Sequence, residues 1–230
     1  MPNDRNKRFA FFDVDGTLIS IKSMFSFQTF YYSKWLSEES SEFQPQRQEF
    51  EKTMTQMQAE EQPREAINAA YYRFFAGRSP RDTQECAFAW FKATLDKRWD
   101  LFLPRSVDVL KHHQSEGVEP TFVSGSSMEI LAPLAESLGV PWVLATHLEV
   151  ENGVYTGRIC PPQTIGAGKA DAIRLFLAEQ NVDARLCFAY GDDRSDLSML
   201  ELVGHPCVVS GDPVLEELAC ARNWPIIMST

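Results

Sequence analysis

The stretch FAFFDVDGT, residues 9–17, decides which fold this chain is predicted to adopt. The apolar run Phe9–Phe12 is typical of a buried strand. Asp13 and Asp15 follow it two positions apart, so their side chains would leave the strand end on the same face. Doubly wound sheets bind ligands beyond the carboxyl ends of their parallel strands. The stretch therefore predicts a carboxylate pair at a binding edge, and the alternative is an ordinary solvated Asp-Gly turn.

The sequence between residues 23 and 103 has a different pattern, because its apolar residues recur at helical spacing and strand signals are almost absent. Breaks at Pro45, at residues 62–63 and at residues 77–80 divide it. The segment is also rich in aromatic residues, which at this spacing indicate a core more often than a pocket. We predict a small bundle of four helices, one starting at Ser23 and the others covering residues 49–60, 66–75 and 83–99.

Helices and strands alternate from Pro104 onward, which is typical of a parallel sheet with crossover helices. An Asn152-Gly153 pair between alternating residues predicts a hairpin. The predicted strands cover residues 120–123, 142–145, 186–190, 207–209 and 226–227, and the predicted helices cover residues 106–114, 128–137, 169–180, 196–202 and 214–222.

The predicted fold class is therefore α/β, with a doubly wound, mainly parallel sheet. Its first strand precedes the helical segment and its other strands follow it. We accordingly expect residues 1–20 and 104–230 to form a catalytic core, with residues 21–103 inserted as a helical cap.

Composition narrows the classes of partner. The chain has 230 residues, 44% of them apolar, and a formal net charge of -10. Nucleic acid and anionic lipid both attract basic surfaces, so neither is an expected partner. No stretch approaches the apolar length of a membrane span, and the polar amino terminus, Met1 to Arg8, does not suit a signal peptide. Five cysteines without a CxxC pair are expected to be reduced, which favours a cytoplasmic protein.

Three further signals fall at predicted strand ends or helix starts. Ser124-Gly125-Ser126 offers hydroxyl and backbone N–H groups where an anion would bind. Lys169 begins a helix after a glycine-containing loop, and taken alone it would be a solvated surface lysine. The sequence GDDRSD, residues 191–196, supplies oxygen ligands suited to Mg²⁺, although acidic turns at helix starts look similar. The order and placement of all these signals favour a shared site.

Together, DVDGT (13–17), VSGS (123–126), Lys169 and GDDRSD (191–196) resemble the motifs of the haloacid dehalogenase superfamily of phosphohydrolases. The helical insertion directly after the first motif is similar to that of subfamily IB, which includes phosphoserine phosphatase. The resemblance implies a Rossmann-like catalytic core, an α-helical cap and a Mg²⁺ cofactor.

The resemblance also implies roles for individual residues. Asp13 would be the nucleophile that becomes an aspartyl phosphate, and Asp15 would be the general acid and base. Mg²⁺ would be held by the Asp13 carboxylate, the Asp15 backbone carbonyl and Asp192, with Asp196 orienting a metal-bound water.

The transferred phosphoryl group would be bound by Ser124, the Gly125 amide and Lys169, which stabilise charge in the transition state. Asp193 fits the same motif, either with a direct role or as a neighbouring acid without one.

Substrate choice is expected to depend on Lys22. In phosphoserine phosphatases a glutamate nine residues after the nucleophile holds the amino group of the substrate, and here that position is a lysine. A cation there would repel an ammonium group and favour an anionic or neutral one, unless Lys22 is simply solvated. Arg73 and Arg78 are further candidates for substrate contact, with solvent-facing arginines as the alternative.

The predicted function is Mg²⁺-dependent hydrolysis of a small phosphorylated metabolite, with phosphoserine itself disfavoured. A phosphotransferase would share the first half of the reaction and stays open as an alternative. A phospho-aspartate signalling domain is a weaker alternative, because it would be about half this length and would lack a counterpart of Asp15.

Overall fold

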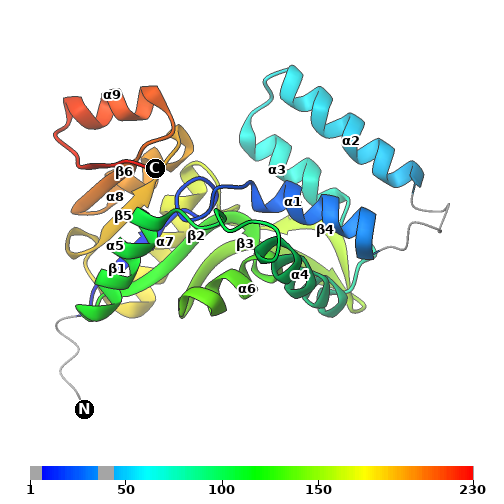
Figure 1. Cartoon of the computed structure of the whole chain (residues 1–230), viewed down its shortest axis with the longest axis horizontal. Coiled ribbons are helices and arrows are strands. Elements are labelled where there is room, and N and C mark those ends of the chain that lie inside the picture. Colours follow the sequence, from blue (N-terminus) through cyan, green and yellow to red (C-terminus); the bar gives the residue numbers. More distant parts are fainter. Residues whose placement is uncertain (1–6, 36–43, 230) are drawn as a thin grey trace, which may run out of the picture.

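The computed structural model describes residues 7–35 and 44–229 (Figure 1). Most of the amino-terminal segment that we expected not to be a signal peptide therefore lies outside the described residues. Within them, seven strands form one sheet in the order β4-β3-β2-β1-β5-β6-β7, and every neighbouring pair is parallel except β3 and β4. The predicted α/β class with a doubly wound, mainly parallel sheet is confirmed. The strands are β1 (Phe9–Phe12), β2 (Glu119–Ser127), β3 (Trp142–Glu151), β4 (Val154–Cys160), β5 (Phe188–Gly191), β6 (His205–Val209) and β7 (Ile226–Ile227).

Strand β1 lies at the centre of the sheet, paired with β2 on one side and β5 on the other. All four of its residues are fully buried, which is why the run is apolar at every position and does not alternate. Phe9 and Phe11 face one hydrophobic cluster, and Ala10 and Phe12 face the other. The chain leaves this strand at Asp13, in the middle of the carboxyl edge.

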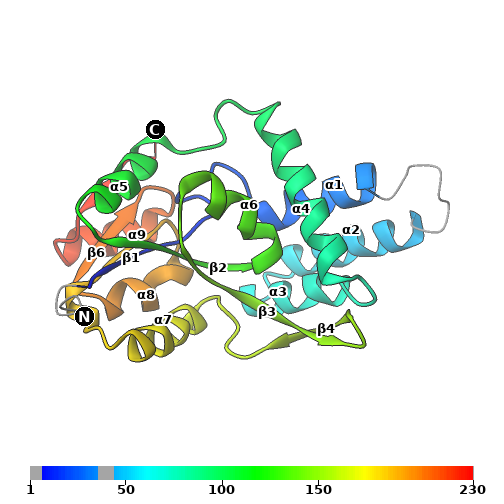
Figure 2. The same ribbon diagram turned by 90° about the horizontal axis from the view of Figure 1, so that it is seen from below.

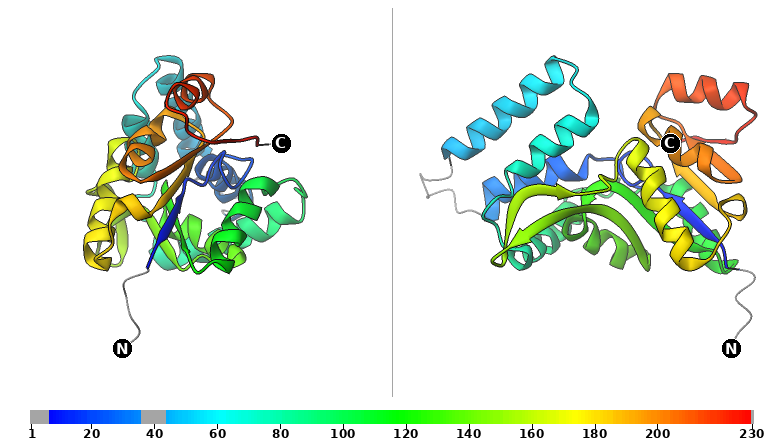
Figure 3. Two further views of the ribbon diagram at one scale, coloured as in Figure 1. Left: turned by 90° about the vertical axis from the view of Figure 1, so that its left-hand side faces the viewer. Right: turned by 180° about the vertical axis from the view of Figure 1, so that it is seen from behind.

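Helices cover both faces of the sheet (Figures 2 and 3). The cluster around Phe9 and Phe11 contains residues of α7 (Ala167–Gln180), α8 (Leu197–Leu202) and α9 (Pro213–Ala221). The cluster around Phe12 contains residues of α5 (Pro104–Ser115) and α6 (Met128–Leu138). This arrangement buries the sheet between two helical layers and leaves its carboxyl edge for the site.

The inserted segment folds as helices α1 (Ser23–Phe30), α2 (Gln44–Ala59), α3 (Arg64–Arg73) and α4 (Pro80–Leu95), with a π-helical turn at Tyr31–Trp35. The helix predicted from residue 49 begins earlier, because Pro45 sits in the first turn of α2, where a missing N–H has no cost. Ser79 caps α4 by accepting a hydrogen bond from Asp82, so that helix also begins before its predicted start.

The inserted helices pack on the rest of the molecule through α4 and α1, which contact α6, and through α3, which contacts β4. The hairpin that carries β4 has left-handed Asn152 and Gly153 at its turn, as their sequence predicts. Its first strand continues from the strand predicted at residues 142–145, so β3 runs unbroken into the hairpin, and the second strand, β4, is the one that packs on α3 (Figure 2). No helix in the described part of the chain combines the length and apolar character needed to cross a membrane.

Candidate active site

A cavity of about 350 Å³ lies at the carboxyl edge of the sheet, between the ends of β1 and β2 and the inserted helices α1 and α3. Its bottom is formed by chain segments that are far apart in sequence, and its upper wall includes Met24, Phe25 and Tyr71. The structure brings most of the residues singled out in the sequence to this cavity. Those that line it are Asp13, Asp15, Lys22, Ser124, Gly125 and Lys169.

Lys169 lies in the first turn of α7 and is almost completely buried, so it is not a solvated surface lysine. Its Nζ lies 2.6 Å from a carboxylate oxygen of Asp13 and 2.6 Å from one of Asp196. Burial alone would lower the pKa of Lys169, but the two carboxylates outweigh it and raise the pKa above its ordinary value. The ammonium group is therefore charged and held at the bottom of the cavity.

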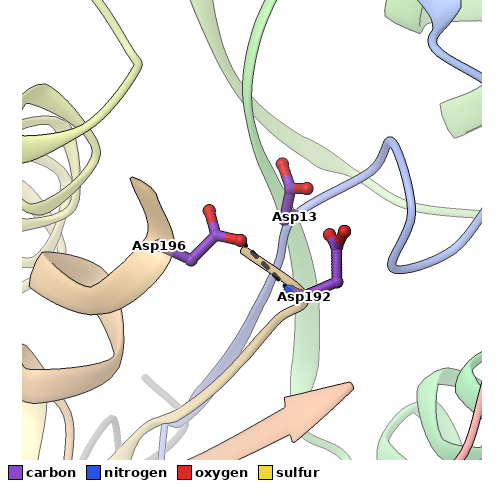
Figure 4. Close-up of side chains that lie close together, drawn as sticks. All are labelled: Asp13, Asp192 and Asp196. Atoms are coloured by element: carbon purple, nitrogen blue, oxygen red, sulfur yellow. Dashed lines mark hydrogen bonds between the residues drawn. The ribbon is translucent and has the colours of Figure 1, made fainter. Parts of the chain in front are cut away.

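Three buried carboxylates meet beside this lysine, and Asp13, Asp192 and Asp196 each offer an oxygen within 4.8 Å of the others (Figure 4). Thr17 Oγ1 donates to Asp192 at 2.9 Å, and the backbone N–H of Asp192 donates to Asp196 at 3.1 Å. Burial, followed by the neighbouring Asp13 charge, raises the pKa of Asp192, and burial also raises that of Asp196. A cluster of hard oxygen atoms with surplus negative charge is chemically suited to Mg²⁺.

Two glycines allow these carboxylates to approach the backbone. Gly16 has a φ of 104°, and a Cβ atom there would overlap the carboxylate of Asp192. A Cβ atom on Gly191 would likewise overlap the side chain of Asp196. The glycines of DVDGT and GDDRSD are therefore required by close packing at the site.

Asp15 is held by the start of helix α1. The backbone N–H and the hydroxyl of Ser23 donate to Oδ2 of Asp15 at 2.8 and 3.0 Å, and its Oδ1 is buried without a hydrogen-bond partner in the described structure. Burial, and then the charge of Asp13, raises the pKa of Asp15 to about 6. Lys22 is exposed, and its Nζ donates to the Asp15 backbone carbonyl at 2.9 Å.

The end of β2 is fixed by hydrogen bonds within Ser124-Gly125-Ser126 and by side chains of α1 and α3 that the sequence did not single out for this role. Ser126 N donates to Ser124 Oγ at 3.2 Å, and the two hydroxyls of Ser126 and Ser23 lie 2.7 Å apart. The carbonyl of Gly125 accepts hydrogen bonds from the side chains of Asn68 and Tyr72, both on α3.

Asp193 and Ser195 also contact α3, through Arg64. The Arg64 guanidinium donates to Asp193 at 2.7 Å and to Ser195 Oγ at 3.2 Å. Asp193 in turn accepts from the N–H of Ser195, so its carboxylate caps a turn and binds the inserted segment. In the sequence, these contacts could have been suspected only from the four-residue spacing of Arg64, Asn68 and Tyr72, because residues at this spacing share one helix face.

The two arginines proposed for substrate contact lie elsewhere. Arg78 is buried within the inserted helices, with its guanidinium 3.7 Å from the Tyr31 ring centre and a hydrogen bond to Gln28. Cation–π contact with the aromatic core accounts for its position. Arg73 is exposed on α3, and neither arginine lines the cavity.

Comparison with known proteins gives a consistent result. A sequence model of the haloacid dehalogenase-like hydrolases matches residues 10–201. A probable phosphatase of Mycobacterium tuberculosis is 39% identical over 127 residues, which cover 55% of this chain and 44% of that protein. The match thus spans about half the length of that relative. A histidinol-phosphatase of Neisseria meningitidis is 25% identical over 232 residues, which cover 96% of this chain and 98% of that protein.

Solved structures share the fold. A protein of unknown function from Bordetella pertussis Tohama I has a TM-score of 0.81 and 26% identity, covering 98% of this chain and 100% of that chain. A phosphoserine phosphatase in its apo form has a TM-score of 0.65 and 16% identity, covering 97% and 94% of the two chains.

Proposed function

This chain belongs to the haloacid dehalogenase-like hydrolases, and we propose that it is a Mg²⁺-dependent phosphatase that forms an aspartyl phosphate on Asp13. The observation that carries the proposal is the convergence of Asp13, Asp15, Ser124 and Lys169 on one cavity. The names of the relatives, a probable phosphatase and a histidinol-phosphatase, support hydrolysis of small phosphomonoesters.

The residues divide the reaction between them. One oxygen of Asp13 is bound by Lys169, and the other would attack phosphorus while the ester P–O bond breaks. Asp15 Oδ1, which has no partner in the described structure, would give its proton to the leaving oxygen. It would then take a proton from the water that hydrolyses the aspartyl phosphate. Ser124 and Lys169 would hold the phosphoryl oxygens throughout.

The acidic cluster fits a divalent cation. We infer that Asp13, Asp192 and the Asp15 backbone carbonyl would hold Mg²⁺, with Asp196 beside them. When bound, the ion would neutralise charge so that an anionic carboxylate can approach an anionic phosphate. The Asp15 carbonyl oxygen accepts a hydrogen bond from the Lys22 ammonium group in this structure. The surroundings of this oxygen therefore suit a positive charge.

Residues 21–103 would act as the cap, and residues 1–20 and 104–230 as the catalytic core. Contacts of Arg64 with Asp193 and of Asn68 with Gly125 support this division, because they join helix α3 to the core beside the cavity that both segments line. A cavity of about 350 Å³ would admit a small phosphorylated metabolite.

Lys22 would set part of the specificity. It lines the cavity beside Asp15, where the leaving group would depart. Apart from Asp13 and Asp15, no carboxylate of the described residues lines the cavity, so a substrate ammonium would meet a cation without a compensating acid. An anionic or neutral group next to the ester is therefore favoured over the amino group of phosphoserine.

A screen of phosphorylated metabolites with the purified protein and Mg²⁺ tests the proposal, with Asp13→Asn as the decisive variant. We expect Asp13→Asn to lower kcat at least about 10³-fold, because the nucleophile is lost. Asp171→Asn is the matched control, since Asp171 is an exposed residue of α7 and among the described residues pairs only with Arg174. Near-normal Mg²⁺-dependent hydrolysis by Asp13→Asn would overturn the proposal.

A further inference from the structure

The carbonyl of Gly125 accepts two hydrogen bonds from one face of helix α3. Asn68 Nδ2 and the Tyr72 hydroxyl each donate to it at 2.9 Å. Both side chains are buried, and both belong to α3, whereas Gly125 belongs to strand β2 of the sheet. A backbone carbonyl has two lone pairs, so these donors satisfy it completely.

The absence of a side chain at Gly125 eases the approach of helix α3. A Cβ atom at this position would lie 3.2 Å from Asn68 Nδ2, a tight contact, and 3.6 Å from Ile165, an ordinary one. Asn68 is itself held from the other side, because Gln163 Nε2 donates to its carbonyl oxygen at 2.7 Å.

Fixing this carbonyl also fixes the N–H group of Ser126, because the two belong to one planar peptide unit. That N–H donates to Ser124 Oγ at 3.2 Å. A hydroxyl that accepts in this way keeps its own proton available, and among the described residues no protein acceptor binds the Ser124 proton. Since Ser124 lines the cavity, that proton is free for an oxygen atom of a bound phosphoryl group.

A second chain of hydrogen bonds starts from the same peptide unit. The hydroxyl of Ser23 donates to Asp15 Oδ2, so the Ser126 hydroxyl, 2.7 Å away, is the donor to Ser23. Ser126 thus contacts both Ser124 and the group that holds Asp15. The orientation of Ser126 therefore affects both Ser124 and, through Ser23, Asp15.

We propose that Asn68 and Tyr72 are positioning residues: their two hydrogen bonds to the Gly125 carbonyl orient Ser124 toward the transferred phosphoryl group. This role rests on the phosphatase function proposed above. It also makes the orientation of Ser124 depend on helix α3, because Asn68 and Tyr72 both belong to that helix.

Tyr72→Phe is the cleanest test, because it removes one donor and keeps the ring that packs against Tyr71 and Phe75. With p-nitrophenyl phosphate and Mg²⁺, we expect kcat to fall about fivefold, equivalent to one hydrogen bond, and KM to change less than about twofold. In a Ser124→Ala background the same substitution is expected to change kcat less than about twofold, because Tyr72 would have nothing left to orient.

Tyr32→Phe is the matched control. It also removes a buried hydroxyl of the inserted helices, but that hydroxyl has no partner in the described structure and its residue does not line the cavity. We expect its kcat to equal that of the wild type. Melting temperatures of all variants separate loss of stability from loss of positioning.

The positioning role would be overturned if Tyr72→Phe lowered kcat by the same factor in the wild-type and Ser124→Ala backgrounds. It would also be overturned if Tyr72→Phe lowered the melting temperature and left kcat unchanged. If Tyr72→Phe does not fold, Asn68→Ala in the same cycle decides by the same criterion. The two proposals can fail separately. If the wild type is active and Asp13→Asn is inactive, but the effects of Tyr72→Phe and Ser124→Ala simply add, the phosphatase function stands and only the positioning role is removed. Absence of hydrolysis by the wild type would overturn both.

Discussion

Ser23 binds a single oxygen atom of Asp15 twice, through its backbone N–H at 2.8 Å and its hydroxyl at 3.0 Å. The carboxyl group is thereby held in one orientation by the first residue of helix α1. Its other oxygen, Oδ1, is buried and has no partner in the described structure. An acid with one oxygen fixed and the other available is well placed to transfer a proton.

Asp15→Asn is expected to lower kcat/KM by about 10²- to 10⁴-fold for alkyl phosphates, because their leaving oxygen needs a proton. The loss of kcat/KM should be much smaller for p-nitrophenyl phosphate, whose leaving group is stable as an anion, while kcat falls for every substrate because Asp15 also takes a proton from the hydrolytic water. A series of phosphomonoesters with leaving groups of different pKa measures this difference. Equal losses of kcat/KM across the series would contradict the role of Asp15 as general acid.

Mg²⁺ is expected to stabilise the folded protein, because it offsets the repulsion among three buried carboxylates. At 100 times its dissociation constant, the ion would add about 2.7 kcal/mol to the free energy of unfolding. Asp192→Asn should reduce the rise in melting temperature, whereas Asp183→Asn, at an exposed residue paired with Arg185, should leave it unchanged. Calorimetry with MgCl₂ and with EDTA provides the measurement, and an undiminished rise for Asp192→Asn would remove it from the metal site.

Lys22→Glu is expected to raise the ratio of kcat/KM for phosphoserine to kcat/KM for glycerol phosphate by about tenfold or more. A carboxylate beside the leaving group would attract the substrate ammonium that the lysine repels. Lys22→Met, which removes the charge without reversing it, should give an intermediate ratio. Unchanged ratios for both variants would show that residue 22 does not contact the substrate.

His113 is expected to make the fold less stable in acid. Its Nε2 lies 2.8 Å from the Tyr190 hydroxyl, and burial, followed by the charges of His112 and Arg8, lowers its pKa from 6.5 to about 4. The unfolded chain therefore binds more protons between these values, and the free energy of unfolding falls as the pH drops from about 6.5 to 4.

Between pH 7 and pH 5 this effect would amount to at most about 2 kcal/mol, because solvent screens part of it. Urea unfolding of the wild type and of His113→Gln at both pH values measures it, because the variant keeps a polar group near Tyr190 but does not titrate. The wild type should lose more stability than the variant. Parallel losses in the two proteins would assign the pH dependence to other groups.

The sequence predicted the fold and the bottom of the cavity well, for two physical reasons. A four-residue apolar run followed by Asp13 is typical of a buried strand in a chain with this βα rhythm, and parallel strands align their carboxyl ends. That rule placed Ser124 and the GDDRSD loop near Asp13 before any coordinates were considered. Lys169 was less certain from its local sequence, and only the tertiary structure shows that it is buried between two carboxylates.

The wall contributed by the inserted helices was not predicted. Asn68 and Tyr72 share a helix face, but periodicity cannot tell which surface that face meets. Arg78 illustrates the opposite error: a cation in a predicted cap was considered for substrate contact, and it lies over the Tyr31 ring instead. Such contacts depend on how two segments pack, and side-chain charge alone does not determine that.

The central position of β1 has a consequence for the order in which the chain can fold during synthesis. Both strands that pair with it come much later in the sequence, β2 from Glu119 and β5 from Phe188. During synthesis this fully buried strand therefore has no sheet neighbour until the whole helical insertion has been translated. We expect nascent chains that end between Ser127 and Phe188 to hold this strand in a sheet open on one side, and therefore to need chaperones.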